Sequence, residues 1–456
     1  MAKSIIKKQY LYEYLAVIAV SLLFLVLGLF LGGLSPIIVV LKEEGFHEIP
    51  PISDSIASWM MNALNIGVIP GALISSYGSD IFGRKYAMLS TIIPQLLSHI
   101  LLYFATNIWM VYSSFFMRGI VLAMTFALVP SYISEVASAK IRGPCATFGP
   151  ILLPIGGLFG GTLQAALSIP LATIIAGILG ICCVPILCFI PESPYFYVAK
   201  QRNDEGKRIL RKLRQTENVD KEFLEIQSAL MEVQKQKNVS WSELFTNKFN
   251  LRILLICGGV QLVQQITGYL PLTGFSANIV TEAGLNLSLV VVTIIINVSN
   301  VGTTIVSIFF VDSLGRRLQF MVDCTMVILG LATLGAGYFF EHYYTSIAFG
   351  ILKLVGILLF LNAYSFGFSF LPNLLSAELF PTDIKAKGVS LLMAVQAVEG
   401  FIVSMLYNKL FLIADYLPFW VFCIFTIIGL IFGYFFIPET KHKTLAEIQK
   451  EFNINP

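Results

Sequence analysis

One short stretch occurs twice in this sequence, as YGSDIFGRK at residues 77–85 and as FVDSLGRR at residues 310–317. Both copies contain Asp, any two residues, Gly, Arg and a second basic residue, and both follow a long apolar run. The Gly permits the sharp backbone reversal of a very short loop between two membrane helices. The Asp can pair with a basic group or cap the next helix. Two copies in equivalent places predict a protein of two related halves.

The composition is typical of a membrane protein. Of the 456 residues, 56% are hydrophobic and 12% are charged, and a soluble domain has about twice that charged fraction. Runs of mainly apolar residues recur, each long enough to cross a bilayer as a helix. We therefore predict an all-α integral membrane protein with 12 transmembrane helices, at roughly 13–40, 56–79, 86–106, 109–133, 144–167, 169–190, 251–275, 287–311, 319–341, 346–376, 387–411 and 417–438.

The basic residues predict the orientation, because cytosolic segments of membrane proteins accumulate Lys and Arg. With the amino terminus in the cytosol, the cytosolic segments contain all of the 30 basic residues except Lys42, Arg118, Lys353 and Lys409. The opposite orientation would place nearly all of this charge outside. We expect both termini to be cytosolic, and we expect a multi-pass protein of the plasma membrane.

The spans fall into two groups of six around a polar segment. The predicted parts are a first six-helix bundle at 1–190, a cytosolic helical linker at 191–250, a second bundle at 251–440 and a cytosolic tail at 441–456. Two parts of the linker, Asp204 to Gln215 and Asp220 to Lys237, are rich in helix-forming residues. In the second of these, Phe223, Ile226, Leu230 and Val233 recur at helical spacing, so we expect short helices that lie on the membrane domain.

Two further motifs are duplicated in the same order. SEVASAKIRG at residues 134–143 corresponds to AELFPTDIKAKG at 377–388, and Pro191-Glu192-Ser193 corresponds to Pro438-Glu439-Thr440. Repeats in the same order are parallel, related by an axis along the membrane normal. This is the arrangement of the major facilitator fold, whose binding site lies at mid-membrane between the halves.

These motifs place acidic and basic residues together at the cytosolic helix ends. Carboxylate and guanidinium groups can pair there, half buried, more strongly than on an open surface. Such pairs could bias an equilibrium between two states and act as gate latches, or the charges could serve only as topology signals. The candidate latch residues are Asp80, Arg84, Glu135, Arg142, Glu192, Asp312, Arg316, Arg317, Glu378 and Glu439.

From about residue 10 to 450 the chain resembles the sugar porter family of the major facilitator superfamily, and within it the insect branch of facilitated trehalose transporter-like proteins. The motifs above carry this resemblance together with Ala57-Ser58-Trp59, Phe116-Met117-Arg118-Gly119, Tyr132-Ile133-Ser134-Glu135, Pro191-Glu192-Ser193-Pro194 and Gln264-Gln265-Ile266-Thr267-Gly268. The resemblance implies movement of a hexose, trehalose or similar polyhydroxy solute by alternating access.

The resemblance also implies a sugar site. The family's Gln pair on span 7 matches Gln264 and Gln265, and its Asn on span 8 matches Asn300. Amide side chains suit sugars because each donates and accepts hydrogen bonds. Other positions depart from the family pattern: its span-5 Gln is Pro150, and its Pro-x-Pro-Trp motif on span 10 ends at Asn373. Asn373 stands where the family has the sugar-stacking Trp of span 10, so that Trp is lost. The family's Asn-Trp pair on span 11 falls near Gln396.

Two ionisable residues inside the spans bear on the driving force. Proton-coupled members of the family carry an acid on span 1, whereas here no Asp or Glu occurs between Glu13 and Glu43. We therefore favour a uniporter. Glu399 near the middle of span 11 could be a cavity acid that binds substrate or a proton; alternatively, it could pair with Lys353 on span 10 or be a hydrogen-bonded neutral acid. The candidate substrate-binding residues are Gln264, Gln265, Asn300, Asn373, Gln396 and Glu399.

Other functions fit the sequence less well. The four His residues are scattered, and no nucleophile–base set or metal-ligand spacing is present, so we expect neither an enzyme nor a cofactor or metal site. A proton-linked carrier of a non-sugar solute that uses Glu399 is an alternative. A non-transporting nutrient sensor is a weaker one, because only 18 residues follow Pro438. The expected partners are a small solute and the lipid bilayer, and no nucleic acid.

Overall fold

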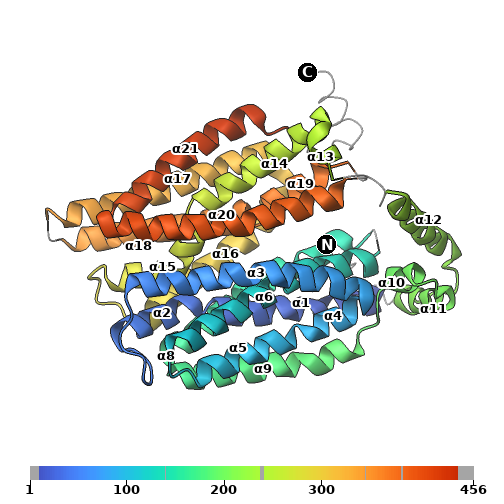
Figure 1. Ribbon diagram of the computed structural model, residues 1–456, viewed down its shortest axis with the longest axis horizontal. Coiled ribbons are helices and arrows are strands. Elements are labelled where there is room, and N and C mark those ends of the chain that lie inside the picture. Colours follow the sequence, from blue (N-terminus) through green and yellow to red (C-terminus); the bar gives the residue numbers. More distant parts are fainter. Residues whose placement is uncertain (1–9, 139, 237–240, 345, 382–383, 440–456) are drawn as a thin grey trace. The chain divides into compact units, whose positions relative to one another are not determined.

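The computed structural model of the chain describes residues 10–138, 140–236, 241–344, 346–381 and 384–439 (Figure 1). In this part of the chain 12 helical segments are long and apolar enough to cross a membrane. They agree with the predicted spans to within six residues at every end, which confirms the all-α membrane fold. The segments are Leu11–Glu43, Asp54–Ile81, Arg84–Tyr103, Ile108–Val136, Arg142–Ala166, Ile169–Phe189, Lys248–Thr281, Leu289–Phe310, Arg316–Glu341, Ile347–Ser376, Lys387–Ile413 and Leu417–Phe436.

The chain forms two compact units. Unit 1 contains residues 1–33 and 66–237, and unit 2 contains residues 34–65 and 238–456. The end of the first span and the start of the second therefore group with the second half of the sequence. The helices of unit 1 are α1 (Leu11–Leu31), most of α3 (Asp54–Ile81), α4 (Arg84–Ser90), α5 (Ile92–Tyr103), α6 (Ile108–Val136), α7 (Arg142–Ala146), α8 (Phe148–Ala166), α9 (Ile169–Phe189), α10 (Pro194–Ala199), α11 (Asn203–Arg214) and α12 (Asp220–Gln236).

Unit 2 begins with α2 (Leu34–Glu43) and the start of α3. The hydroxyl of Ser35 on α2 accepts a hydrogen bond of 2.9 Å from the backbone N–H of Ala277, so α2 packs on α15. The remaining elements are α13 (Glu243–Thr246), α14 (Lys248–Ile266), α15 (Tyr269–Thr281), α16 (Leu289–Leu314), α17 (Arg316–Glu341), α18 (Ile347–Ala363), the π-helical turn η3 (Tyr364–Phe368), α19 (Leu371–Leu379), α20 (Lys385–Ile413) and α21 (Leu417–Phe436).

Glycines allow two helices of unit 1 to pack with their backbones in contact. A Cβ atom built on Gly156 of α8 would lie 2.0 Å from the carbonyl oxygen of Leu25 on α1. One on Gly160 would lie 1.8 Å from the carbonyl oxygen of Leu29. Close approach of this kind is how helices associate in lipid, where burial of apolar side chains supplies little driving force between helices.

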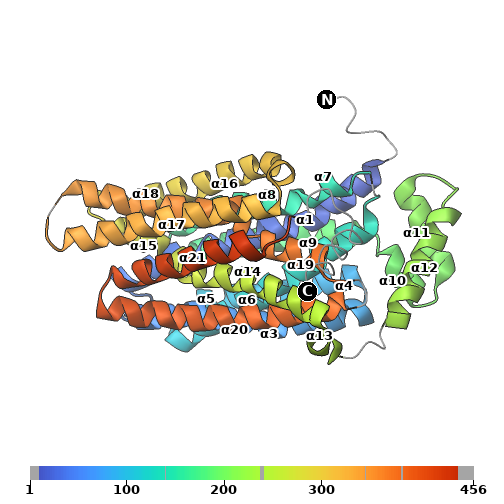
Figure 2. The ribbon, with the colours of Figure 1, turned by 90° about the horizontal axis from the view of Figure 1, so that it is seen from above.

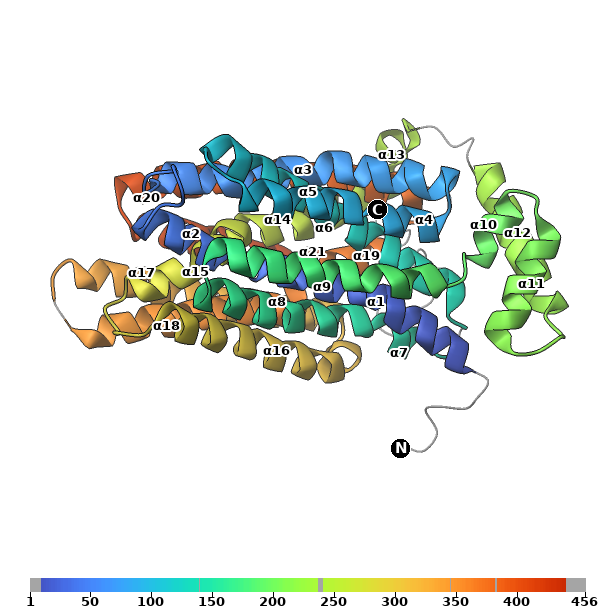
Figure 3. The ribbon, with the colours of Figure 1, turned by 90° about the horizontal axis from the view of Figure 1, so that it is seen from below.

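The linker forms helices at one end of unit 1, where Figures 2 and 3 both place α10, α11 and α12. The predicted helices are confirmed as α11 and α12. Together with α10 they enclose a small core of buried side chains, against which Leu230 of α12 is partly buried. The core consists of Val198 of α10, Leu210 of α11, Val219 just before α12, and Phe223 and Ile226 of α12. The side chain of Val233 lies outside the described residues. The predicted tail at 441–456 also lies outside them.

Candidate functional site

The loop between α3 and α4 is held by the carboxylate of a residue that is far from it in the sequence but belongs to the same unit. Gly83 precedes α4 with φ of 98°, a conformation that favours glycine. The Glu192 carboxylate accepts the backbone N–H of Arg84 at 2.9 Å and that of Lys85 at 3.1 Å. A Cβ atom on Gly83 would lie 2.3 Å from Oε2 of Glu192. Glycine is therefore needed here both for the turn and for the carboxylate that caps the first turn of α4.

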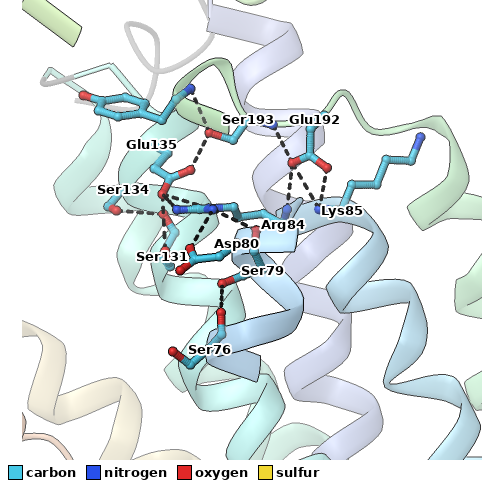
Figure 4. A network of polar contacts seen from close by, with 11 residues as sticks. Ser76, Ser79, Asp80, Arg84, Lys85, Ser131, Ser134, Glu135, Glu192 and Ser193 are labelled. Carbon is cyan, nitrogen blue, oxygen red and sulfur yellow. Dashed lines mark hydrogen bonds and ion pairs between the residues drawn. The ribbon is translucent and has the colours of Figure 1, made fainter. Parts of the chain in front are cut away.

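The side chain of Arg84 joins two more helices to this loop (Figure 4). Its Nη2 lies 3.1 Å from Oε1 of Glu135 on α6, and its Nη1 donates to the carbonyl of Ser79 at 2.9 Å. Asp80 lies 3.7 Å from the same guanidinium. The Ser193 hydroxyl donates to the other oxygen of Glu135. The ends of α3 and α6 and the start of α10 are thus tied together through one arginine.

Burial raises the pKa of Glu192 above its ordinary value. The backbone N–H groups of Ser193, Lys85 and Arg84 and the charge of Arg84 act in the opposite direction without reversing it. Glu192 is 6% exposed. The loop therefore depends on a carboxylate that lies away from water.

Unit 2 repeats this arrangement at the start of α17. Gly315 has φ of 81°, and the Glu439 carboxylate accepts the backbone N–H of Arg316 at 3.0 Å and of Arg317 at 3.3 Å. The guanidinium of Arg316 lies 2.8 Å from Glu378 on α19. Arg317 instead donates to the carbonyl of Tyr434 on α21. The duplicated sequence motifs thus form duplicated three-helix clusters.

Each cluster lies within a single unit. Among the predicted latch residues, the structure brings together Arg84 with Glu135, Glu192 and Asp80, and Arg316 with Glu378 and Glu439. Arg142 is exposed and donates to the carbonyl of Ala137 at 3.4 Å, outside these clusters. The side chain of Asp312 lies outside the described residues. The latch role of these residues stays a prediction.

A second polar cluster lies inside unit 2, among α14, α20 and η3. Gln264 on α14 is 2% exposed and donates through Nε2 to the hydroxyl of Tyr364 at 3.1 Å and to the carbonyl of Phe368 at 2.5 Å. Its oxygen accepts from Nε2 of Gln396 on α20 at 3.2 Å. The ring of Tyr269 stacks on that of Tyr364, with centroids 3.3 Å apart. We call Gln264, Tyr269, Tyr364 and Gln396 the amide–tyrosine cluster.

The other predicted substrate residues differ in their surroundings. Asn300 accepts from the hydroxyl of Ser365 in η3 at 3.2 Å. Glu399 accepts from Nε2 of Gln261 at 3.5 Å and is half-buried. Gln265 is half-buried on α14, and Asn373 is exposed on α19. Within the described residues, neither side chain forms a hydrogen bond with the amide–tyrosine cluster.

One of the alternatives suggested for Glu399, an ion pair with Lys353, is wrong. Lys353 pairs with Glu341 at the end of α17, and its ammonium lies 3.8 Å from the centroid of the Tyr338 ring. In the described part of the chain it forms no ion pair with Glu399. The reason is geometric: α17 and α18 are joined by a short connection, so Glu341 and Lys353 meet at the same end of the bundle.

Sequence reasoning missed Tyr364 and Ser365, which connect the predicted amides to span 10. Span 10 is interrupted by the π-helical turn η3 before Pro372. A π-helical turn redirects side chains and often marks a functional site. The sequence signal for it is weak, because Gly367 and Pro372 are compatible with several local conformations.

Comparisons with known proteins agree with this architecture. The family described as sugar (and other) transporter matches residues 8–452. The facilitated trehalose transporter Tret1 of Polypedilum vanderplanki is 26% identical over 446 residues, which cover 97% of this chain and 88% of that protein. The Bombyx mori protein of the same name is 27% identical, with 98% and 88% covered. The Anopheles gambiae protein of that name is 26% identical over 96% of this chain, but this chain spans only 56% of its length.

Solved structures share the fold. The proton:xylose symporter XylE bound to 6-bromo-6-deoxy-D-glucose has a TM-score of 0.77 at 20% identity, and the match covers 97% of this chain and all of the other. The inward-open XylE from E. coli has a TM-score of 0.75 at 20% identity, with 95% and 98% covered. The predicted family is confirmed by the match to nearly the whole sequence: the chain belongs to the family of sugar (and other) transporters.

Proposed function

We propose that this transporter moves a sugar, trehalose or a hexose, across the plasma membrane by facilitated diffusion, with the amide–tyrosine cluster as part of its sugar site. The observation that carries the proposal is the set of contacts among Gln264, Gln396 and Tyr364, which come from spans 7, 11 and 10. Each amide and the hydroxyl can both donate and accept, as a sugar hydroxyl can. A sugar can therefore replace these contacts one for one.

The stacked tyrosines supply the apolar part of such a site. Sugar rings have C–H faces that pack on aromatic rings, and ligand sites combine aromatic walls with a few placed polar groups. Tyr269 and Tyr364 stack with ring planes 10° apart beside the Gln264 amide. We infer that they replace the aromatic surface of the tryptophan that span 10 lacks.

The environment of Arg118 supports uncoupled transport. Arg118 on span 4 is 2% exposed and donates to the hydroxyl of Ser98 and the carbonyl of Phe30, each at 3.3 Å. Its guanidinium also lies 4.4 Å from the centroid of the Phe30 ring. Within the described residues no carboxylate is within ion-pair distance of it. Glu13, the acid at the start of span 1, pairs with Arg214 instead, so this arginine has no acid partner to exchange protons with.

We call the cluster around Arg84 in unit 1 and the cluster around Arg316 in unit 2 the loop clusters. They are proposed to act as latches at the cytosolic ends of the spans. Opening the cytosolic side requires the helix ends that meet in each cluster either to move as one group or to separate. In unit 1 these ends belong to α4, α6 and α10. In unit 2 they belong to α17, α19 and the segment after α21. The Arg84–Glu135 and Arg316–Glu378 pairs favour the joined arrangement, so they weight one state of the transport cycle. In this proposal both termini are cytosolic, as the distribution of basic residues favours.

A proton-linked carrier is the second candidate. It is favoured by Glu399, a half-buried acid whose described partner is the Gln261 amide at 3.5 Å, a long hydrogen bond. If Glu399 takes up the coupled proton, Glu399→Gln abolishes the pH dependence of transport. An unchanged pH profile in that variant would remove this candidate.

Uptake into proteoliposomes tests the main proposal. Labelled trehalose and labelled D-glucose are offered to vesicles that contain the purified protein, with and without an imposed pH gradient. We expect saturable uptake of at least one sugar, and we expect the gradient to drive no accumulation of the sugar above its outside concentration. Gln264→Ala should weaken the apparent affinity about fivefold or more, because loss of one buried hydrogen-bonding partner costs about 1–3 kcal/mol. No saturable flux of either sugar, or an unaffected Gln264→Ala variant, would reject the proposed site.

A further inference from the structure

One carboxyl group in unit 2 belongs neither to the loop clusters nor to the amide–tyrosine cluster. Asp323 lies on α17, seven residues after Arg316, which is about 10 Å along the helix axis. It is 0% exposed and is the only Asp among the described residues that is buried. Ionisable groups inside membrane spans are costly to keep charged and are retained for function, so each needs a stated partner.

Among the residues that the structure describes, no positively charged side chain pairs with Asp323. On its own helix, Arg316 pairs with Glu378 of α19, and Arg317 donates to the backbone of Tyr434 on α21. Lys353 of α18 pairs with Glu341 at the far end of α17. The other titratable side chains of the described residues on α17 and on the elements that pack against it are all of types that carry no positive charge. They are Cys324 and Tyr338 on α17 itself, Tyr364 in η3, Glu378 on α19, and Cys423, Tyr434 and the following Glu439 at α21. The side chain of Asp312 on α16 lies outside the described residues.

The hydrogen bonds around Asp323 lack one donor. Nε2 of Gln319 donates to Oδ1 of Asp323 at 3.2 Å and to the carbonyl of Phe366 at 3.4 Å, which uses both amide hydrogens. Oδ2 of Asp323 and Oε1 of Gln319 are buried and have no partner. Both of these atoms are acceptors, so neither can satisfy the other. A proton on Oδ2 would supply the missing donor, because a neutral carboxyl and an amide can exchange two hydrogen bonds.

Asp323 also packs directly on the π-helical turn. A Cβ atom built on Gly367 of η3 would lie 1.9 Å from Oδ2 of Asp323 and 2.4 Å from Nε2 of Gln319. The carboxyl group therefore occupies the space that a side chain at position 367 would fill. A negative charge on Oδ2 would face the backbone of this turn without a donor, whereas a protonated oxygen can donate a hydrogen bond.

The same turn holds the predicted sugar site. Gln264 donates to Tyr364 and Phe368, the first and last residues of η3, and Asn300 accepts from Ser365. Side chains from spans 7, 8 and 9 thus meet five consecutive residues of span 10. A change in the position of η3 at the Asp323 side necessarily moves groups that contact Gln264 and Asn300.

We propose that Asp323 is a proton-binding site, neutral in the state described here, and that its deprotonation disturbs η3 and weakens sugar binding. The proton adds to Oδ2 and leaves to solvent, with no other bond made or broken. The coupling to sugar depends on the proposed function, but the proton site does not. The consequence is transport that slows as the pH rises, without any net proton movement being required.

Infrared spectroscopy of the purified protein tests the proton site without any sugar. A neutral carboxyl group gives a C=O stretch apart from that of carboxylates, and labelling all aspartates with ¹³C shifts it only if the acid is an Asp. We expect a neutral-carboxyl band near neutral pH that shifts with the label, is absent in Asp323→Asn and remains in Glu399→Gln. The labelling result stands even if Asp323→Asn does not fold. A band insensitive to aspartate labelling, or one unchanged from pH 5 to 10, would overturn the site.

Binding of trehalose and D-glucose, followed by thermal shift across the same pH range, tests the coupling. We expect affinity to fall about fivefold or more, the usual lower range of linked sites, over the pH interval in which the infrared band disappears. In Asp323→Asn the affinity should not change with pH. A band that titrates while sugar affinity stays constant would overturn the coupling. If neither sugar binds, the proposed function fails, and the infrared result still decides the proton site.

Discussion

Nη1 of Arg214 on α11 lies 3.0 Å from Oε1 of Glu13 at the start of α1. Glu13 is 0% exposed, and its other oxygen accepts the backbone N–H of Ser138 at 2.7 Å. The same guanidinium donates to the carbonyl of Val136 at the end of α6 and pairs with Glu222 of α12. Burial lowers the pKa of Arg214, but the carboxylates of Glu222 and Glu13 outweigh it, so the net shift is upward. One arginine therefore fastens the linker helices to two spans.

Arg214→Ala should destabilise the protein by about 3–5 kcal/mol, because it leaves Glu13 buried as an uncompensated charge. The measurement is thermal unfolding of the purified protein in lipid. The matched control is Arg211→Ala on the same helix, whose ion pair with the exposed Glu217 is worth about 0–1 kcal/mol. Adding Glu13→Gln to Arg214→Ala should recover part of the loss. Equal effects of the two alanine variants would contradict the buried pair.

Arg316→Ala should slow sugar uptake about tenfold or more, which corresponds to a rise of at least about 1.4 kcal/mol in the free-energy barrier of transport. Arg316 pairs with Glu378, whereas the adjacent Arg317 donates to a backbone carbonyl. Arg317→Ala is therefore the matched control and should have a smaller effect on the rate. Exchanging the two charges, as Arg316→Glu with Glu378→Arg, should restore part of the rate. If the two alanine variants slow uptake equally, the latch role assigned to the pair is wrong.

Mild acid should stabilise the loop that Glu192 caps. Because burial raises the pKa of Glu192, the folded protein binds this proton more tightly than the unfolded chain. The linked stability is fully present below the unfolded-state pKa and is lost as the pH rises through the folded-state pKa. Lowering the pH from 7 to 5 should thus raise the unfolding temperature of the wild type relative to Glu192→Gln, which cannot titrate. The same pH dependence in both proteins would show that Glu192 is not the group involved.

Gly160→Ala should destabilise unit 1 strongly, since the added Cβ would lie 1.8 Å from the Leu29 carbonyl oxygen. Helices α1 and α8 must then move apart, with loss of their close backbone contact. Gly302→Ala on α16 is the control, because apart from the neighbouring backbone of its own helix no atom lies within 4 Å of the position of its Cβ. That variant should be neutral or more stable by about 0.5–1 kcal/mol, the helix preference of Ala over Gly. Unfolding temperatures of the two variants decide the matter, and a tolerated Gly160→Ala would rule out the tight α1–α8 packing.

The predicted spans and the duplicated motifs were recoverable from local patterns. Span positions follow from apolar length alone, because every backbone polar group in a bilayer must be satisfied within its own helix. The meeting of Arg84 with Glu135, and of Arg316 with Glu378, was also foreseeable, since positively charged loop residues and the acids of spans 4 and 10 were expected at one membrane face. Their third partners, Glu192 and Glu439, belonged to the same duplicated set.

Contacts between helix interiors were not foreseeable in this way. The pair of Glu399 with Lys353, one of the alternatives suggested, does not form, because Lys353 pairs with Glu341. Asp323, Arg214 and Tyr364 were not predicted to have special roles. Their contacts depend on the rotation of each helix about its axis, and hydrophobic periodicity defines that rotation poorly in a span that is apolar on every side. The π-helical turn at Tyr364–Phe368 shifts the register of span 10 once more.

By itself, the sequence determined the number, order and approximate ends of the membrane helices in the described part of the chain, and the family of the chain, because hydrophobic length and short motifs are properties of contiguous residues. Only the tertiary structure decided which buried polar groups meet. Gln264 reaches Tyr364 and Phe368, and Asp323 faces Gly367, across large separations in the chain. The reason is physical: in an apolar interior each polar group must find a partner, and the packing of whole helices selects which one is within reach.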